Sequence, residues 1–300
     1  MQFASTNLKV DMIVWTGDNI AHDIWHQSKD NQTLSTYVLT QEIMKYFPNT
    51  TVYPMFGNHE AYPADEFDTV GDESAWLLDE LTTMWRTWLD EDALHTFSKK
   101  SYYATVNPKF NVKIIALDTQ ACDSADFYII RDPTDPMHEL EWLRKELYDS
   151  ESKNQGVIIM GHIPPGHYSC DTSIVIFWDL YIKNFMKGWA ARYSAVVERF
   201  TNTIRAQLFG HTHVDHIEIV KSFKDGTPVG SVLIAPSFTT YYLIDWIDFL
   251  KEKNRFEHLQ PSFRIIEMDA ETHQPVNIHQ YRLDLNKWNQ DTTGPLQWDL

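Results

Sequence analysis

Four residues whose side chains could bind a metal ion occupy equivalent places in the sequence, each directly after a glycine that ends a short apolar run. They are Asp18, Asn58, His162 and His211. Carboxylate oxygen, amide oxygen and imidazole nitrogen together form a donor set that suits divalent metal ions. Glycine lets the chain turn sharply where a buried strand ends, and α/β sheets build their sites at the carboxyl ends of strands. The pattern therefore predicts that four separate strands deliver these side chains to one metal site.

Further candidate residues lie close to these four in the sequence. His213 follows His211 by two positions, and alternate residues of an extended segment face opposite ways, so His213 is expected to serve a second metal ion. Glu60 and Asp215 are each either a hydrogen-bond partner of a ligand imidazole or a solvated acid.

The elements that must position these side chains follow from hydrophobic patterning. Strands are expected at 11–16, 52–56, 102–106, 112–117, 157–160, 206–209, 216–220, 231–235 and 263–268. Helices are expected at 28–47, at 74–89, from the N-cap Asp135 onward and over most of 174–205. The apolar stretch 241–250 is interpreted as a packed amphipathic helix, with the rim of an amphiphile-binding cleft as the alternative. Strands alternate with helices early and follow one another directly later, which predicts a mixed α/β (α+β) fold.

Length and composition are those of a globular protein with a large core. The chain has 300 residues, 43% hydrophobic and 14% aromatic, so we expect one large domain or one domain with a small appendage. The formal net charge is −17, and such a surface repels phosphate backbones, which argues against a nucleic-acid partner. No apolar run approaches the roughly 20 residues that a membrane helix needs, so no transmembrane segment is predicted.

Three features bear on the compartment in which the protein is found. Cys122 and Cys170 are the only cysteines, and their number alone leaves two free thiols and one disulfide equally open. Two Asn-x-Thr tripeptides make Asn31 and Asn49 predicted glycosylation sites. The first ten residues show neither the basic nor the apolar segment of a signal peptide.

The ordered blocks Gly-Asp, Gly-Asn-His-Glu, Gly-His and Gly-His-x-His resemble those of the calcineurin-like metallophosphoesterase superfamily. Longer stretches are similar to acid sphingomyelinase and the sphingomyelinase-like phosphodiesterases: WTGDNIAHDIWHQ at 15–27, GHIPPGH at 161–167, FGHTHVD at 209–215 and APSFTTY at 235–241. The resemblance covers roughly residues 10 to 285. It implies a metallophosphoesterase-type two-sheet β-sandwich flanked by helices.

The resemblance also implies a two-metal site that hydrolyses phosphodiesters. In such sites a carboxylate and a hydroxide bridge two cations about 3.5–4 Å apart, and the hydroxide attacks phosphorus in line with the leaving oxygen. Asp18 matches the bridging carboxylate. Asn58, His162 and His211 would complete one zinc site with it, and His213 would belong to the other.

Two further histidines match family positions that do not bind metal. His59 is expected to stabilise the phosphoryl oxygen or to protonate the leaving alkoxide, which is general acid catalysis. His22 matches a histidine of the sphingomyelinase branch with a similar role at the leaving group. His167 and Tyr241 are candidate residues of the substrate pocket.

Three functional hypotheses follow from the resemblance. The leading one is a zinc-dependent phosphodiesterase that cleaves sphingomyelin to ceramide and phosphocholine, with peripheral contact to the membrane holding this phospholipid. The second keeps the mechanism but takes nucleotides or other small phosphodiesters. The third is an inactive paralogue or fragment that serves as a binding protein. Cys122 and Cys170 lie where the family has half-cystines, so the resemblance implies a disulfide and a secreted protein or one of the lysosomal or endosomal lumen.

One superfamily block, Asp-x-His, is absent, because no Asp in the sequence is followed two residues later by His. Only ten residues precede the first expected strand, too few for the strand and loop that carry this block. We therefore expect residues 1–285 to form a catalytic domain that is incomplete at its N-terminus, and residues 286–300 to begin a truncated C-terminal region. We accordingly expect this chain to bind one zinc ion, whereas an intact relative holds two, and to show little activity on its own.

Overall fold

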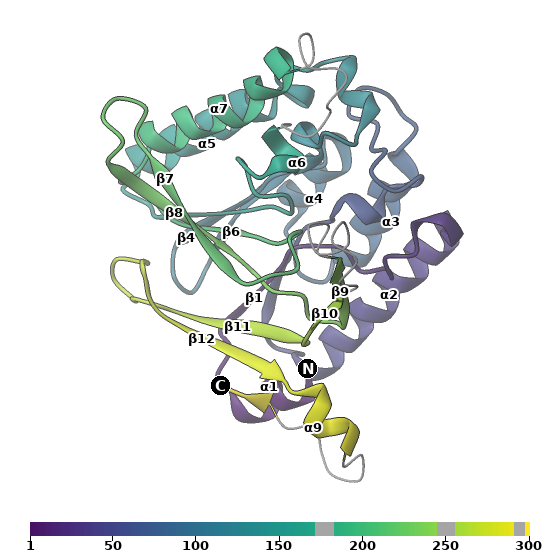
Figure 1. The fold of residues 1–300 in the computed structure, drawn as a ribbon. Helices are drawn as coiled ribbons and strands as arrows, with labels where there is room; N and C mark the ends of the chain where they lie inside the picture. Colours follow the sequence, from purple (N-terminus) through teal and green to yellow (C-terminus); the bar gives the residue numbers. More distant parts are fainter. Residues whose placement is uncertain (172–182, 245–255, 291–297) are drawn as a thin grey trace.

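A six-stranded mixed sheet forms the centre of the fold (Figure 1). The computed structural model describes residues 1–171, 183–244, 256–290 and 298–300. The strands across the sheet are β3 (Tyr103–Asn107), β4 (Val112–Ala116), β5 (Val157–Met160), β6 (Ile204–Phe209), β8 (Pro228–Ile234) and β7 (His216–Lys221). The four central strands run parallel, and each edge strand is antiparallel to its neighbour. This arrangement confirms the mixed α/β fold expected from the sequence.

The two strands β4 and β5 are buried along their whole length. They are almost entirely apolar because both faces of a parallel sheet are covered by other elements. The one charged side chain in these strands, Lys113, is 7% exposed and donates to Glu146 and Asp149 at 2.8 and 2.9 Å. Two carboxylates at its tip allow a lysine to occupy an otherwise apolar layer.

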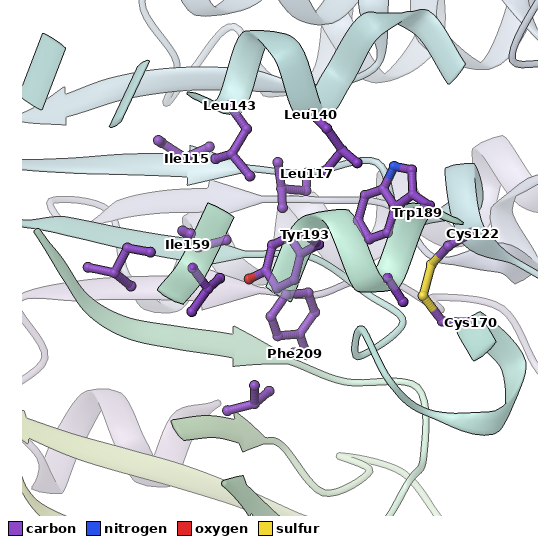
Figure 2. Close-up of a cluster of buried hydrophobic side chains, with 14 of the residues drawn as sticks. Ile115, Leu117, Cys122, Leu140, Leu143, Ile159, Cys170, Trp189, Tyr193 and Phe209 are labelled. Atoms are coloured by element: carbon purple, nitrogen blue, oxygen red, sulfur yellow. A yellow bond between two sulfur atoms is a disulfide. The ribbon is translucent and has the colours of Figure 1, made fainter. Parts of the chain in front are cut away.

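Helices α5 (Glu139–Ser152) and α7 (Lys183–Arg199) cover one face of this sheet. Figure 2 shows the core between these helices and the sheet, where Leu143, Ile159, Trp189 and Phe209 are all buried. At the border of this core, the short helix α6 (Tyr168–Asp171) is joined to the segment after β4 by the Cys122–Cys170 disulfide. The structure thus contains the disulfide that the family resemblance implies.

The opposite face of the sheet carries smaller sheets and further helices (Figure 1). The small sheets are the parallel pair β1 (Met12–Trp15) and β2 (Thr51–Pro54), the antiparallel pair β9 (Tyr241–Ile244) and β10 (Phe256–Leu259), and the three strands β11 (Ser262–Met268), β12 (Pro275–Leu283) and β13 (Trp298–Asp299). A second apolar cluster joins Tyr53 of β2 and Met268 of β11 to Ile158 of the large sheet. These small sheets form the second layer of the expected sandwich.

The remaining helices lie at the ends of the sheets and beside them. They are α1 (Gln2–Asn7), α2 (Lys29–Tyr46), α3 (Ala75–Trp85), α4 (Glu91–Lys100) and α9 (Leu285–Gln290), with the short 3-10 helices η1 (Ile24–His26), η2 (Asn58–Glu60), η3 (Thr119–Cys122), η4 (Phe127–Ile130) and η5 (Pro136–His138). Helix α5 begins at Glu139 after η5, and the Asp135 carboxylate accepts from the backbone N–H of Leu140 at 2.8 Å. Asp135 is therefore a cap, although the regular helix starts later than expected.

Two stretches near the C-terminus differ from expectation or extend it. The helix interpretation of 241–250 is wrong for its first four residues, which form strand β9 paired with β10, and residues 245–250 lie outside the described part of the chain. Within 286–300, β13 pairs with the end of β12, where Trp298 lies opposite Leu283.

Candidate metal centre

The four predicted ligand side chains stand at the ends of β1, β2, β5 and β6, as the glycine pattern predicts. Asp18 and His211 both have left-handed backbones, with φ of 56° and 70°, and so does His213 with 63°. Such conformations are uncommon outside glycine. Gly17 has φ of 91°, and a Cβ atom there would lie 2.2 Å from the backbone nitrogen of Gly57. The two strand ends can therefore approach each other only because residue 17 is glycine.

Asp18, His162 and His211 converge, since one ligand atom from each lies within 4.8 Å of the others. His162 Nε2 is 3.0 Å from Asp18 Oδ2 and 3.3 Å from His211 Nδ1. Asn58 joins the group, because its Oδ1 is 3.0 Å from His211 Nδ1. Residues separated by up to 193 positions, from Asp18 to His211, thus meet in one small volume.

Neighbouring groups direct the ligand atoms of this cluster inward. His162 Nδ1 is 2.6 Å from the carbonyl oxygen of Thr16, which can only accept, so Nδ1 carries a proton and Nε2 faces Asp18. Burial would lower the pKa of His162, but the nearby Asp18 outweighs burial and raises it, so without a metal ion Nε2 also carries a proton, which it shares with Asp18. Asn58 Nδ2 donates to Asp65 Oδ1 at 2.6 Å, which directs the amide oxygen at His211. Ligand orientation by such outer contacts is typical of metal sites.

The charges in the cluster favour a cation. Burial and the nearby His162 lower the pKa of His211 well below its usual value, so this ring is neutral near pH 7. Burial alone would raise the pKa of Asp18, but His162 holds it below the usual range and Asp18 is ionised. Among the described residues, Asp18 Oδ2 is buried without a hydrogen bond of good geometry. Oxygen and nitrogen atoms that face inward around a buried, ionised carboxylate fit a divalent metal ion.

Glu60 holds the ends of β1 and β2 together. It is fully buried, and its carboxylate accepts from the backbone N–H groups of Gly57 at 2.6 Å, Asp18 at 2.8 Å and Asn19 at 2.6 Å. Burial, followed by the negative charge of Asp18, raises the pKa of Glu60 to about 7. Neither alternative from the sequence describes Glu60, because its contacts are backbone amides rather than an imidazole or solvent.

Three other predicted histidines form a group beside the cluster. The ring centroids of His22 and His59 are 4.4 Å apart, and those of His22 and His213 are 6.0 Å apart. His59 is buried and its backbone N–H donates to Asp18 Oδ1 at 3.1 Å, whereas His22 is exposed. The structure thus brings both candidate proton donors next to the metal centre. His213 is not one of the three residues whose ligand atoms converge.

The remaining predicted residues are distributed around the site and over the surface. The rings of His167 and His211 are 5.5 Å apart, so His167 borders the centre. Tyr241 begins β9, and its side chain lies outside the described part of the structure. Asn31 on α2 and Asn49 after it are both exposed. Asp215 forms an ion pair with Arg264.

Sequence reasoning missed three residues that contact the ligands: Thr16, Asp65 and Ser169, whose Oγ is 2.9 Å from His211 Nε2. Thr16 acts through its backbone carbonyl, which any residue type would provide. Asp65 and Ser169 lie in loops or short helices, where no periodicity marks them.

A model of one protein family, described as calcineurin-like phosphoesterase, matches residues 1–215. The chain belongs to the calcineurin-like phosphoesterase family. Proteins of this metallophosphoesterase family use divalent metal ions, in agreement with the donor cluster at the strand ends. The matched region contains all four sequence blocks described above: Gly-Asp, Gly-Asn-His-Glu, Gly-His and Gly-His-x-His.

Curated proteins that are similar to this chain are named as phosphodiesterases. Sphingomyelin phosphodiesterase A of Dictyostelium discoideum is 37% identical over 97% of this chain and 45% of its own length. The human sphingomyelin phosphodiesterase is 32% identical over 97% of this chain and 42% of its own. The human cyclic GMP-AMP phosphodiesterase SMPDL3A is 28% identical over 97% of this chain and 60% of its own. The chain thus spans about half the length of these relatives.

No helix among the described residues combines the length and the apolar character needed to cross a membrane.

Proposed function

We propose that the protein is a metal-dependent phosphodiesterase. The observation that carries this proposal is the convergence of Asp18, Asn58, His162 and His211, whose ligand atoms face one another within coordination reach. Buried carboxylate, amide and imidazole groups gathered this closely suit a bound cation, which would replace the proton that His162 shares with Asp18. The chain also belongs to a phosphoesterase family, which supports hydrolysis of phosphoesters as the reaction at this cluster.

Zinc is the metal that we propose, because two imidazoles beside carboxylate and amide oxygens suit a borderline cation. Asp18, Asn58, His162 and His211 would hold one ion. His213, whose ring lies 6.0 Å from that of His22, would contribute to a second ion that shares Asp18 as a bridge. When bound, such ions polarise phosphoryl oxygens and lower the pKa of water.

The chain's own residues would handle the leaving group. His59 is buried next to Asp18 and contacts the ring of His22, so either imidazole could reach a group bound at the metal centre. The backbone N–H of His59 is bonded to Asp18, whereas burial and the nearby His59 lower the pKa of His22 and favour its neutral form. We assign His59 as the general acid for the leaving alkoxide and His22 as its partner.

The proposed substrate is sphingomyelin, which would be cleaved to ceramide and phosphocholine at the surface of a membrane. Similarity supports this choice, since the relatives at 37% and 32% identity are named sphingomyelin phosphodiesterases. A small phosphodiester such as a nucleotide is the second candidate, supported by the 28% identical cyclic GMP-AMP phosphodiesterase. His167 and Tyr241 are proposed to contact the substrate.

The test compares zinc-supplemented hydrolysis of sphingomyelin in mixed micelles with hydrolysis of cyclic GMP-AMP. We expect His59→Ala to lower turnover by about 10²- to 10⁴-fold, and His162→Ala to abolish both turnover and tight zinc binding. Replacement of the exposed His95 on α4 by Ala is the matched control and should change neither. Turnover that survives chelation of metal, or that is unaffected in His162→Ala, would contradict the proposal.

We also propose that the protein is secreted or works in the lysosomal or endosomal lumen. The Cys122–Cys170 disulfide and the exposed Asn31 and Asn49 sequons support an oxidising compartment with glycosylation. Enzymatic removal of N-glycans from the protein made in a eukaryotic host should reduce its mass. An unchanged mass would exclude glycosylation at both asparagines.

A further inference from the structure

Ser169 stands between two imidazoles at the edge of the metal centre. It belongs to helix α6 and is only 8% exposed. Its Oγ lies 2.8 Å from His167 Nδ1 and 2.9 Å from His211 Nε2. One hydroxyl therefore connects a residue at the border of the site to a proposed metal ligand.

The direction of these hydrogen bonds follows from donor and acceptor accounting. The backbone N–H of Ser169 also points at His167 Nδ1, at 3.4 Å, so this nitrogen is an acceptor. The Ser169 hydroxyl then donates its single hydrogen to His167 Nδ1 and has only lone pairs left for His211. His211 must consequently carry its proton on Nε2, which leaves Nδ1 with a free lone pair. That lone pair is the one that faces Asn58 Oδ1 and His162 Nε2.

The hydroxyl is fixed in place by covalent and backbone bonds on both sides. The next residue, Cys170, is disulfide-bonded to Cys122. The Ser169 carbonyl accepts from the backbone N–H of Ser124 at 2.7 Å, and Cys170 N–H donates to the carbonyl of His167 at 2.9 Å. The disulfide and these contacts tie helix α6 to the segment after β4. The backbone that carries Ser169 is therefore held on both sides, and the side chain is buried between the two imidazoles.

We propose that Ser169 is a positioning residue that sets the tautomer and the ring orientation of His211, so that His211 Nδ1 is presented to the metal ion. This inference rests on the proposed function, because it assumes that the cluster binds metal. It extends the site by one residue and makes the disulfide-bonded helix α6 its outer support. Contacts of this kind typically change metal affinity by about 10- to 100-fold when they are removed.

The experiment measures zinc affinity of the full chain by competition with a chromophoric chelator, together with the visible absorption spectrum of the cobalt(II) form. We expect Ser169→Ala to weaken zinc binding by about tenfold and to alter the cobalt spectrum, because the His211 ring can rotate or change tautomer. Ser169→Thr keeps the hydroxyl and should restore most of the affinity. Ser150→Ala is the matched control, since Ser150 is also a buried serine but lies in α5.

The outcomes separate this inference from the proposal on which it rests. An unmodified chain that binds neither zinc nor cobalt overturns the proposed function and this inference with it. Tight binding by the unmodified chain together with equal affinity and an identical cobalt spectrum in Ser169→Ala overturns the role of Ser169 alone. A loss of affinity that Ser150→Ala reproduces would also overturn it, because the effect would then reflect general destabilisation.

Discussion

Asp118, at the end of β4, is a buried acid whose replacement by asparagine should stabilise the protein at neutral and alkaline pH. Its side chain is fully buried, and Ser101 Oγ lies 2.5 Å from both Asp118 Oδ2 and the carbonyl oxygen of Lys100. The Ser101 hydroxyl donates to Asp118 Oδ2, and this contact favours the ionised carboxylate. Burial is the larger effect, and it raises the pKa of Asp118 to about 7 in spite of this contact.

The size of the effect follows from linkage. The ordinary pKa of this group is 3.8, so between about pH 4 and 7 the folded state holds one proton that the unfolded state has lost. The free energy of unfolding then falls by ~1.4 kcal/mol for each pH unit, or by ~4 kcal/mol once the pH exceeds 7. Asp118→Asn avoids this loss, because its amide can donate to Ser101 and accept from the backbone N–H of Gln120 without ionising.

Urea unfolding of the unmodified chain and of Asp118→Asn at pH 5 and pH 8 tests this reasoning. The advantage of the variant should grow by ~3 kcal/mol between the two pH values, since most of the linkage lies in that interval. Asp79→Asn on the exposed surface of α3 is the control for the loss of one negative charge. An advantage that is equal at both pH values, or a variant that is less stable at pH 8, would show that Asp118 is ionised in the folded protein.

Three further predictions concern other contacts of the structure. Asp65→Ala removes the acceptor that orients Asn58 and should weaken zinc binding by about 10- to 100-fold in chelator competition; unchanged affinity would refute the orienting role. Replacing both Cys122 and Cys170 by serine opens a cross-link between residues 48 positions apart and should lower the free energy of unfolding by about 4 kcal/mol in urea; a loss below about 1 kcal/mol would contradict this estimate. Lys113→Met should cost less than about 1 kcal/mol, because the carboxylates left behind are 28% and 42% exposed and remain hydrated; a loss of about 3–5 kcal/mol would mean that they behave as buried charges.

The location of the metal centre could be predicted because it depends on strand ends, which leave a local signal. An apolar run followed by glycine marks such an end at Gly17, Gly57, Gly161 and Gly210, and each run indeed ends a strand or lies at its edge. Parallel strands share an edge, which brings the residues after Gly17 and Gly57 together in one sheet and those after Gly161 and Gly210 together in the other. The packing of the two sheets against each other joins these two pairs.

The orientation of each ligand could not be predicted, because it depends on contacts between distant positions. The His162 ring is fixed by the backbone carbonyl of a residue 146 positions away. Every residue type has a backbone carbonyl, so the sequence does not indicate which one will accept this hydrogen bond. Glu60 was expected to contact an imidazole or solvent, but a buried carboxylate can also be satisfied by several amides at a tight turn. Strand β9 was missed for a related reason, as its pairing with β10 is a tertiary contact that overrides a helical pattern.

The left-handed backbones at Asp18, His211 and His213 have a consequence for protein engineering. Each such residue carries a conformational cost of order 1–3 kcal/mol, which the surrounding structure must offset. Glycine at any of these positions would relieve this conformational cost but would remove a side chain that is proposed to bind metal. Thermostability screens of mutant libraries in buffers containing EDTA should therefore enrich glycine at these three codons. The same screens run with zinc present should select against it, so that the chosen buffer would decide whether the improved clones can still bind metal.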